Sequence, residues 1–273
     1  MTVDAAQRGA GRCVGNAPMD AIVSLFGALS LPENEVQAER LTTRMLGAAE
    51  ARIVSFLNAH AVNIAVQDVA FAGALLRSDY LLRDGSGVKL GCLLLGVAPG
   101  PNLNGTDLIP KIIAHFKEHR IAVFGAEPRW LEEASQRWRA QGVRDLIARD
   151  GFQSADVYAA LLKASRPELV VLGMGMPKQE LLAEQLRLVA RAEGIPTLIV
   201  NGGAIIDFTA GKVGRAPVWM RKLGIEWVYR LLTEPGRLAR RYLLGNPLFL
   251  WRVLLTRIAR GPHPILVKDR ERA

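Results

Sequence analysis

The chain has 273 residues, of which 50% are hydrophobic and 22% are charged. This composition excludes an intrinsically disordered protein and predicts one globular domain with an appendage, or two small domains. Only two cysteines are present, Cys13 and Cys92, and no Cys/His spacing resembles a zinc site. A disulfide-rich secreted framework is therefore excluded, and a reducing compartment such as the cytoplasm is favoured.

The net charge of +9 is unevenly distributed along the chain. From Thr209 to the C-terminus, 14 lysines and arginines face 4 aspartates and glutamates, whereas the preceding part has 21 basic and 22 acidic residues. The excess positive charge therefore belongs entirely to the C-terminal segment, which indicates an anionic partner for that segment.

The first residues of the chain carry no regular pattern. Residues 1–18 are small and polar and predict a flexible arm. The apolar run from Ala21 to Leu31 follows Arg8 and Arg12, as in a signal peptide, but Asp20 abuts it and no A-x-A cleavage site follows. We interpret this run as the first strand.

Short β-rich runs alternate with amphipathic stretches between residues 19 and 208. This alternation predicts an α/β core of Rossmann-like type, with a mostly parallel sheet covered by helices on both faces. The predicted strands are Ile22–Phe26, Arg52–Leu57, Tyr80–Leu82, Ile121–Phe124, Val143–Ala148, Leu169–Leu172 and Thr197–Val200. The clearest predicted helices are Trp130–Gln141, Ser154–Ala164 and Gln179–Glu193.

The segment 209–273 differs in kind, because it has no strand signal. Aromatic, leucine and arginine residues recur at helical spacing between Pro217, Pro235 and Pro247, which predicts three or four short helices. The longest apolar stretch, Tyr242–Leu255, is interrupted by Arg252 and by Gly245 to Pro247, so we expect no membrane span.

In a parallel sheet, ligands bind outside the carboxyl ends of the strands, so the residues after each strand matter most. The run LGMGMPKQE places Gly173 and Gly175 after a buried strand and before a helix, which is the geometry of an anion site. The next strand ends at Asn201-Gly202. A tight turn without a ligand explains the glycines of LGMGMPKQE about equally well.

Asp84 follows a predicted strand and precedes a helix, so its carboxylate is expected in the same crevice. Burial there would raise its pKa toward the working range of a general base. Asp84-Gly85 is also an ordinary turn signal, and that reading is the commoner one.

Other polar residues in the predicted crevice can be explained by local structure alone. Asn104 and Thr106 are placed to cap a helix, with Asp107 in its first turn. Asn58, His60 and Asn63 form a second polar cluster after a strand. His115 and His119 share a helix face, but Phe116 replaces the glutamate of H-E-x-x-H, so no metal site is predicted.

Three arginines of the C-terminal segment, Arg230, Arg237 and Arg240, recur at offsets of seven and three residues, which predicts one helix face. Guanidinium groups bind phosphate oxygens bidentately, so this face would suit a diphosphate. It would equally suit an anionic lipid surface, with the tryptophans and leucines of the segment sinking into the interface.

Two other classes of protein fit parts of this pattern. The strand, G-x-G, helix order is typical of a nicotinamide-dependent oxidoreductase, but Lys178 replaces the third glycine and Asn201 replaces the acidic ribose partner. A non-catalytic basic module would bind membrane or nucleic acid through the tail. The aromatic and leucine content favours lipid over nucleic acid.

Seven segments, in order, resemble the WecG/TagA/CpsF glycosyltransferases, family 26 of the glycosyltransferases, which includes the exopolysaccharide enzyme GumM. The resemblance covers residues 53–242. Its motifs are Asn58-Ala59-His60, Asp84-Gly85-Ser86-Gly87-Val88, Asn104-Gly105-Thr106-Asp107-Leu108, GMGMPKQE from Gly173, Asn201-Gly202-Gly203-Ala204, Arg215-Ala216-Pro217 and GIEWVYRLLTEPGRLARR from Gly224.

This resemblance implies an inverting transfer from a UDP-sugar to an undecaprenyl-diphosphate-linked sugar in cell-surface polysaccharide synthesis, without a metal or other cofactor. The enzyme would lie on the inner face of the cell membrane; homo-oligomerisation is left open. Asp84 matches the proposed catalytic base and Gln179 the active-site glutamine. The residues implied in donor binding are Asn58, Asn104, Thr106, Gly173, Gly175, Asn201, Gly202, Arg230, Arg237 and Arg240.

Two positions depart from the family pattern. Phe56 stands where many members have threonine, and Asn102 stands where many have arginine. Both positions are expected to border a sugar, so the transferred hexose stays open between glucose, N-acetylmannosamine and its uronic acid.

Overall fold

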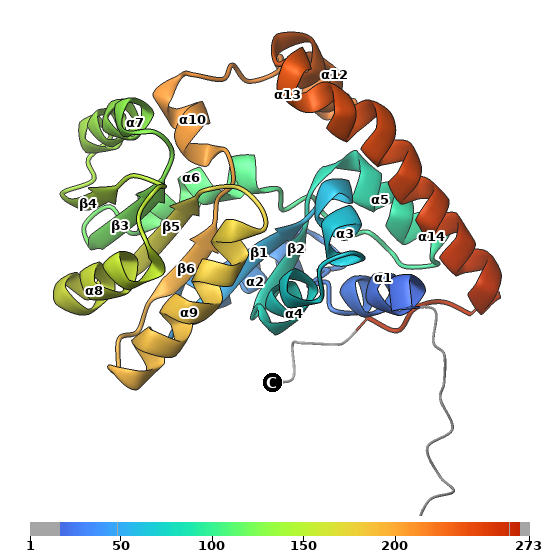
Figure 1. The fold of residues 1–273 in the computed structure, drawn as a ribbon, viewed down its shortest axis with the longest axis horizontal. Coiled ribbons are helices and arrows are strands. Elements are labelled where there is room, and N and C mark those ends of the chain that lie inside the picture. The colour runs from blue at the N-terminus through green and yellow to red at the C-terminus, as the bar shows by residue number, and fades with distance from the viewer. Residues whose placement is uncertain (1–16, 48, 262, 268–273) are drawn as a thin grey trace, which may run out of the picture.

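The computed structural model describes residues 17–47, 49–261 and 263–267. At its centre lies a six-stranded sheet in which all pairings are parallel, with strand order β2-β1-β6-β5-β3-β4 (Figure 1). The strands are β1 (Arg52–Leu57), β2 (Tyr80–Arg83), β3 (Arg120–Gly125), β4 (Asp145–Arg149), β5 (Leu169–Gly173) and β6 (Leu198–Asn201). The Rossmann-like α/β prediction is confirmed.

The strands are buried on both faces, which explains why they read as continuous apolar runs. Val54 and Phe56 of β1 point to one face, and Ile53 and Leu57 to the other. The first face packs against α2 (Glu35–Leu46), α6 (Gly105–His115), α7 (Pro128–Ala140) and α10 (Ile205–Ala210).

The opposite face is covered by two groups of helices. Over β3, β5 and β6 lie α8 (Ala155–Ser165) and α9 (Lys178–Ala192). Around β1 and β2 lie α1 (Ala17–Gly27), α3 (Ala59–Ala65), α4 (Val69–Arg77) and α5 (Gly85–Leu94). The sheet is therefore covered by one hydrophobic cluster on the first face and by two on the opposite face.

The prediction of a strand at Ile22–Phe26 is wrong, because these residues lie in α1. Ile22, Leu25 and Phe26 are buried whereas Ser24 is exposed, and the spacing of three and four residues from Ile22 is that of one helix face. A run of five residues is shorter than two helical turns, so its pattern fits a short buried strand as well as a helix. The predicted arm falls on residues 1–16, outside the described residues, and on Ala17 and Pro18, which begin α1.

The C-terminal segment is helical, as predicted, but its described part has five helical elements instead of three or four, and the last of them is long. In the described part of the segment they are α11 (Val218–Lys222), α12 (Glu226–Thr233), α13 (Pro235–Ala239), the π-helix η1 (Arg240–Gly245) and α14 (Asn246–Arg260). Pro235 and Pro247 stand in the first turns of α13 and α14, where proline starts a helix rather than breaking one.

The last helix, α14, is built into the core. Its Phe249, Val253 and Thr256 are fully buried, and the helix contacts α1, α3 and α5 (Figure 1). Gly91 of α5 makes this approach possible, because a Cβ there would come within 2.8 Å of Phe26 and 3.0 Å of Phe249. The segment is thus anchored at its far end, while α11 to α13 lie over the carboxyl edge of the sheet.

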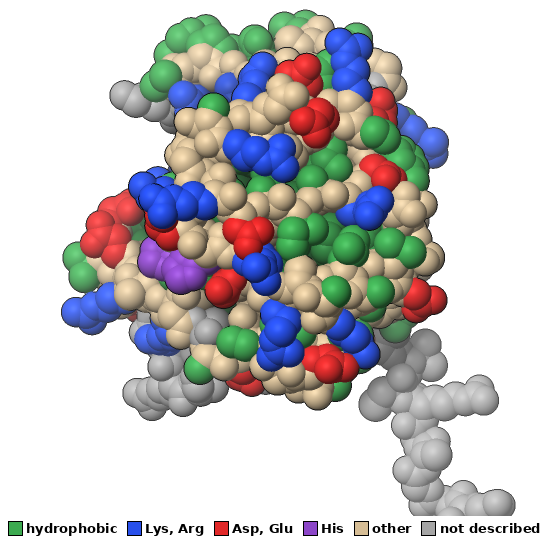
Figure 2. All heavy atoms as spheres, turned by 90° about the vertical axis from the view of Figure 1, so that its left-hand side faces the viewer, with side chains coloured by type: hydrophobic (Ala, Val, Ile, Leu, Met, Phe, Trp, Pro, Cys, Tyr) green, Lys and Arg blue, Asp and Glu red, His purple; other side chains and the backbone are tan. Residues whose placement is uncertain are grey.

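None of the helices in the described ranges combines the length and the apolar character needed to cross a membrane. On the face formed by α7 and α8, basic and acidic side chains are interspersed, whereas hydrophobic side chains gather at the height of α12 and α13 (Figure 2). This distribution agrees with the near-neutral balance of the residues before Thr209.

Candidate active site

A cavity of about 1000 Å³ opens at the carboxyl edge of the sheet. All six strand ends contribute to its wall, and the C-terminal segment supplies the opposite side. The residues that follow the strands are Asn58, Asp84, Ala126, Gly151, Met174 and Gly202, and those from the C-terminal segment are Arg230, Leu238, Arg240, Arg241, Leu244 and Leu248. The volume suits a ligand of nucleotide size.

Asp84 lies in this cavity as the N-cap residue of α5, yet its side chain makes no capping hydrogen bond. Its backbone N–H donates to the Leu57 carbonyl at 2.9 Å, which ties the ends of β2 and β1 together. Desolvation raises the pKa of Asp84, and a hydrogen bond with Asn58 and the charges of Arg241 and Arg230 oppose that rise. The carboxylate of Asp84 therefore does not cap α5, and its hydrogen-bond partner is Asn58.

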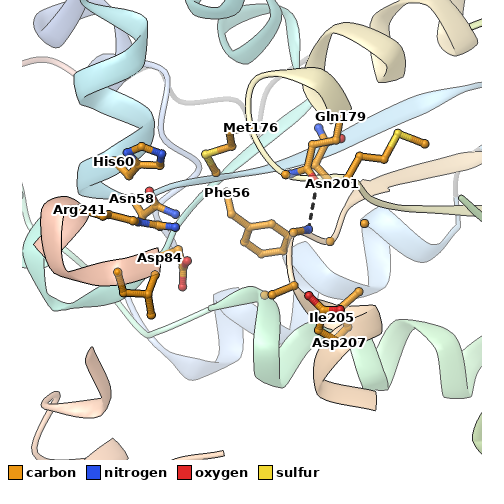
Figure 3. Close-up of a pocket in the computed structure, with 18 of the residues that line it drawn as sticks. Phe56, Asn58, His60, Asp84, Met176, Gln179, Asn201, Ile205, Asp207 and Arg241 are labelled. Atoms are coloured by element: carbon orange, nitrogen blue, oxygen red, sulfur yellow. Dashed lines mark hydrogen bonds between the residues drawn. The ribbon is translucent and has the colours of Figure 1, made fainter. Parts of the chain in front are cut away.

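Arg241 was not among the residues predicted for the site, and His60 was named only as part of the polar cluster after β1, but both lie beside Asp84. Figure 3 shows Arg241, Asn58 and Asp84 grouped on one side of the cavity, with His60 above them. Burial and then the charge of Arg241 lower the pKa of His60 to about 4. The imidazole is therefore neutral near neutral pH, and the positive charge beside Asp84 comes from arginine.

Two of the predicted donor-binding glycines are needed for packing. A Cβ on Gly173 would meet Ile206 at 2.5 Å, and one on Gly202 would meet Ile205 at 2.6 Å. Gly175 is different, since its φ is +77° and a Cβ there would meet nothing within 4 Å. Gly175 is thus the glycine of this turn that leaves space and a left-handed backbone at the cavity.

We predict that Gly173→Ala lowers the free energy of unfolding by about 1–3 kcal/mol, because the added methyl group overpacks the junction of β5 with α10. Gly236→Ala on α13 is the matched control, since a Cβ there meets nothing within 4 Å. Urea denaturation of both variants measures the difference. Equal stabilities would contradict the packing role of Gly173.

Gln179 and Asn201 are almost completely buried carboxamides that border the cavity from α9 and β6. Asn201 Nδ2 donates to Ser55 Oγ at 2.8 Å, and Ser55 Oγ lies 2.7 Å from Ser78 Oγ. Gln179 Oε1 accepts from the Gly203 N–H at 3.0 Å. Both side chains are therefore oriented by the protein itself before any ligand binds.

The remaining predicted residues from the sheet edge divide into two groups. Asn58 and Thr106 line the cavity. Asn104 does not, and its carboxamide accepts from the Asp107 N–H at 2.9 Å and donates to Asp107 Oδ2 at 2.7 Å. Its observed function is capping of α6, and its role in donor binding stays a prediction.

The inference that Arg230, Arg237 and Arg240 share one helix face is wrong. They lie on three elements, α12, α13 and η1, because the backbone breaks at Glu234, where φ is −133° and ψ is 56°. Arg230 and Arg240 nevertheless both line the cavity, whereas the side chain of Arg237 lies outside the described part. Arg241 also lines the cavity, although it did not fit the predicted helical spacing. It lies in the π-helix η1, which has more residues per turn than an α-helix, so the spacing of an α-helix does not apply there.

Arg230 is positioned at the cavity by an aromatic ring. Its guanidinium lies 5.1 Å from the ring centroid of Phe208 on α10, which also borders the cavity. Its buried Nε has no hydrogen-bond partner among the described residues. A buried donor without an acceptor is costly, so an anion at this position would stabilise it.

The C-terminal segment is tied to the core on both sides of the cavity. Asp107 of α6 forms ion pairs with Arg215 and Arg221. On the other side, Asn63 of α3 donates to the Gly245 carbonyl at 2.7 Å and accepts from Arg252 at 2.8 Å. These contacts hold α11 to η1 over Asp84.

Among the described residues, no group of three or more His, Cys, Asp or Glu side chains is arranged to hold a metal ion. The absence of a metal requirement stays an expectation. The cavity is lined by three carboxylate residues, by carboxamides and by three guanidinium groups, and Asp84 is the carboxylate that lies beside Asn58 and Arg241 (Figure 3).

In a wound parallel α/β sheet the crevice at the carboxyl ends of the strands is where ligands bind, and this cavity lies there. Residues 27–262 match the model of the glycosyl transferase WecG/TagA/CpsF family, so the chain belongs to that family. Its enzyme class is glycosyltransferase, which decides against the oxidoreductase and the non-catalytic module.

Two bacterial relatives support this membership. The chain is 30% identical over 220 residues to an N-acetylglucosaminyldiphosphoundecaprenol N-acetyl-beta-D-mannosaminyltransferase of Bacillus spizizenii, covering 76% of this chain and 81% of the relative. It is 28% identical over 208 residues to the protein of the same name from Bacillus subtilis, covering 74% of this chain and 78% of that relative.

Proposed function

We propose that this enzyme transfers a hexose from a UDP-sugar to a sugar linked to undecaprenyl diphosphate, with inversion at the anomeric carbon and without a metal. The observation that carries the proposal is Asp84, a desolvated carboxylate in a cavity that also holds Arg230 and Arg241. The names of the relatives support the lipid-linked N-acetylglucosamine acceptor and make N-acetylmannosamine the first donor sugar to test.

In the proposed reaction, Asp84 accepts the proton of the acceptor hydroxyl as that oxygen attacks the anomeric carbon. The bond between this carbon and the UDP oxygen breaks on the opposite side, so the configuration inverts. The raised pKa of Asp84 supports this role, because a carboxylate close to the operating pH is a more effective base than one with an ordinary pKa.

The departing UDP gains negative charge, which in the absence of a metal must be stabilised by fixed donors. Arg230 and Arg240 line the cavity from the C-terminal segment, and Gly175 leaves its backbone open to the ligand. The segment that carries the two arginines is tied to the core by the ion pairs of Asp107 and the hydrogen bonds of Asn63. Such preorganisation is what electrostatic stabilisation of a leaving group requires.

The enzyme is proposed to lie on the cytoplasmic face of the cell membrane, where a lipid-linked acceptor would be found. Large apolar side chains are exposed along the C-terminal segment, with Trp219 59% and Trp251 57% exposed. The same segment carries the excess positive charge of the chain. Aromatic and leucine side chains beside arginines suit an anionic membrane interface.

The test is a transfer assay with a panel of UDP-sugars and a polyprenyl-diphosphate-linked N-acetylglucosamine in anionic vesicles. We expect mass spectrometry to show one added hexose from one preferred UDP-sugar, with equal rates in the presence of EDTA. Analysis of the product by NMR gives the anomeric configuration. Transfer only from sugars on another nucleotide, or loss of transfer with EDTA, would refute the proposal in that respect.

A further inference from the structure

Two polar side chains at the start of α9, Gln179 and Glu180, are buried next to each other. Gln179 is 0% exposed and Glu180 is 2% exposed. Burying polar groups is unfavourable unless each finds a hydrogen-bond partner. Their arrangement therefore needs a specific explanation, and Gln179 is the one that borders the cavity.

The two side chains form a directed chain of hydrogen bonds. Gln179 Nε2 donates to Glu180 Oε1 at 2.8 Å, and Gln179 Oε1 accepts from the Gly203 N–H at 3.0 Å (Figure 3 shows the second bond). A carboxamide can accept only through oxygen and donate only through nitrogen. Because the Gly203 amide can only donate, it requires the oxygen end of Gln179, and Glu180 occupies the nitrogen end.

These two hydrogen bonds connect the two turns that face the ligand. Gln179 follows the glycine-rich turn after β5, and Gly203 lies in the turn between β6 and α10. A backbone hydrogen bond also joins these regions, from the Gly202 N–H to the Leu172 carbonyl at 2.7 Å. With Gln179 reversed, two N–H groups would face each other at Gly203 and the second connection would be lost.

We propose that Glu180 is a positioning residue that sets the orientation of Gln179 and thereby fixes the turn at Gly203 against the turn after β5. Only the identity of the ligand bound between these turns rests on the proposed function. Glu180 acts through Gln179 and does not touch the ligand.

The electrostatics of Glu180 suit this position. Its Oε2 is buried without a hydrogen-bond partner among the described residues. Burial raises the pKa of Glu180 to about 7, against the hydrogen bonds from Gln179 and from its own backbone. Below neutral pH the side chain is therefore largely uncharged, and it can then hold Gln179 without placing a full negative charge beside a diphosphate.

The experiment compares Glu180→Met, which removes the acceptor at similar volume, with Glu180→Gln, which keeps an acceptor for Gln179. Amide hydrogen exchange at Gly203 is measured by NMR in the full-length protein. We expect exchange about 5- to 10-fold faster in Glu180→Met, as loss of one hydrogen bond predicts, and near the wild-type rate in Glu180→Gln. Unchanged exchange at Gly203 in Glu180→Met would overturn the proposal.

A second variant covers the case in which Glu180→Met does not fold. Gln179→Met removes the carboxamide itself and keeps Glu180, so it should speed exchange at Gly203 to the same extent. Wild-type exchange in this variant would also overturn the positioning role.

UDP binding separates this inference from the proposed donor. We expect the Kd of UDP and the donor KM to rise several-fold in Glu180→Met, with a smaller change in kcat and recovery in Glu180→Gln. UDP binding that is undetectable even in the wild type would refute UDP as the ligand, whereas the exchange at Gly203 would still decide the role of Glu180. Equal donor KM in all folded variants would overturn the effect of Glu180 on the site.

Discussion

Replacing Asp84 by asparagine is expected to lower kcat by about 10²- to 10⁴-fold, which is the usual contribution of a general base. The substitution preserves the shape of the side chain but removes the proton acceptor. Because Asp84 makes no capping bond to α5, the fold should be unaffected. UDP affinity, measured by calorimetry, should stay close to the wild-type value.

The pH dependence of kcat provides an independent measurement of the same role. A base must be ionised to act, so wild-type activity should fall as the pH drops below the raised pKa of Asp84. Asp20→Asn is the matched control, since Asp20 is an exposed carboxylate on α1. Near-normal turnover in Asp84→Asn would remove Asp84 from the mechanism.

Replacing Arg230 or Arg241 by glutamine is expected to lower kcat/KM by about 10²- to 10³-fold each, the size of effect seen when one fixed donor is removed from a site of charge development. For Arg241 a second consequence follows, because its charge lowers the pKa of both Asp84 and His60. Its loss raises the pKa of Asp84 further. The acid limb of the pH–rate profile should therefore move to higher pH in Arg241→Gln.

Arg260→Gln is the control for net charge, because Arg260 is exposed at the end of α14 and does not border the cavity. It should keep nearly full kcat/KM. An Arg241→Gln profile that coincides with the wild-type profile in its acid limb would contradict the electrostatic effect of Arg241 on Asp84.

Point substitutions are better tests of the C-terminal segment than its deletion. A chain ending near Asp207 would lose α14 as well as the arginines. Removal of the buried Phe249 and Val253 would leave an apolar cavity between α1, α3 and α5. Loss of activity in such a truncated chain would reflect lost core packing as much as lost catalysis.

Local sequence patterns were sufficient for the sheet and for most of the candidate site. From Arg52 onward, each predicted strand coincides with an observed strand to within two residues at either end. Asp84 and Asn201 were placed correctly at the cavity because parallel strands bring their carboxyl ends to one edge. The same patterns failed at Ile22–Phe26, because a run of five residues is too short to distinguish the helical period of α1 from a short buried strand.

The amino-acid sequence by itself therefore determined the α/β class, the family and the residues after each strand, because these depend on short-range periodicity and on motifs in order. Tertiary structure alone decided which arginines reach Asp84, since the break at Glu234 and the π-helical turn at Arg240 alter the direction of each side chain. It also decided that Gly173 serves packing and that α14 belongs to the core. Each of these depends on contacts between segments far apart in the chain, which local periodicity does not contain.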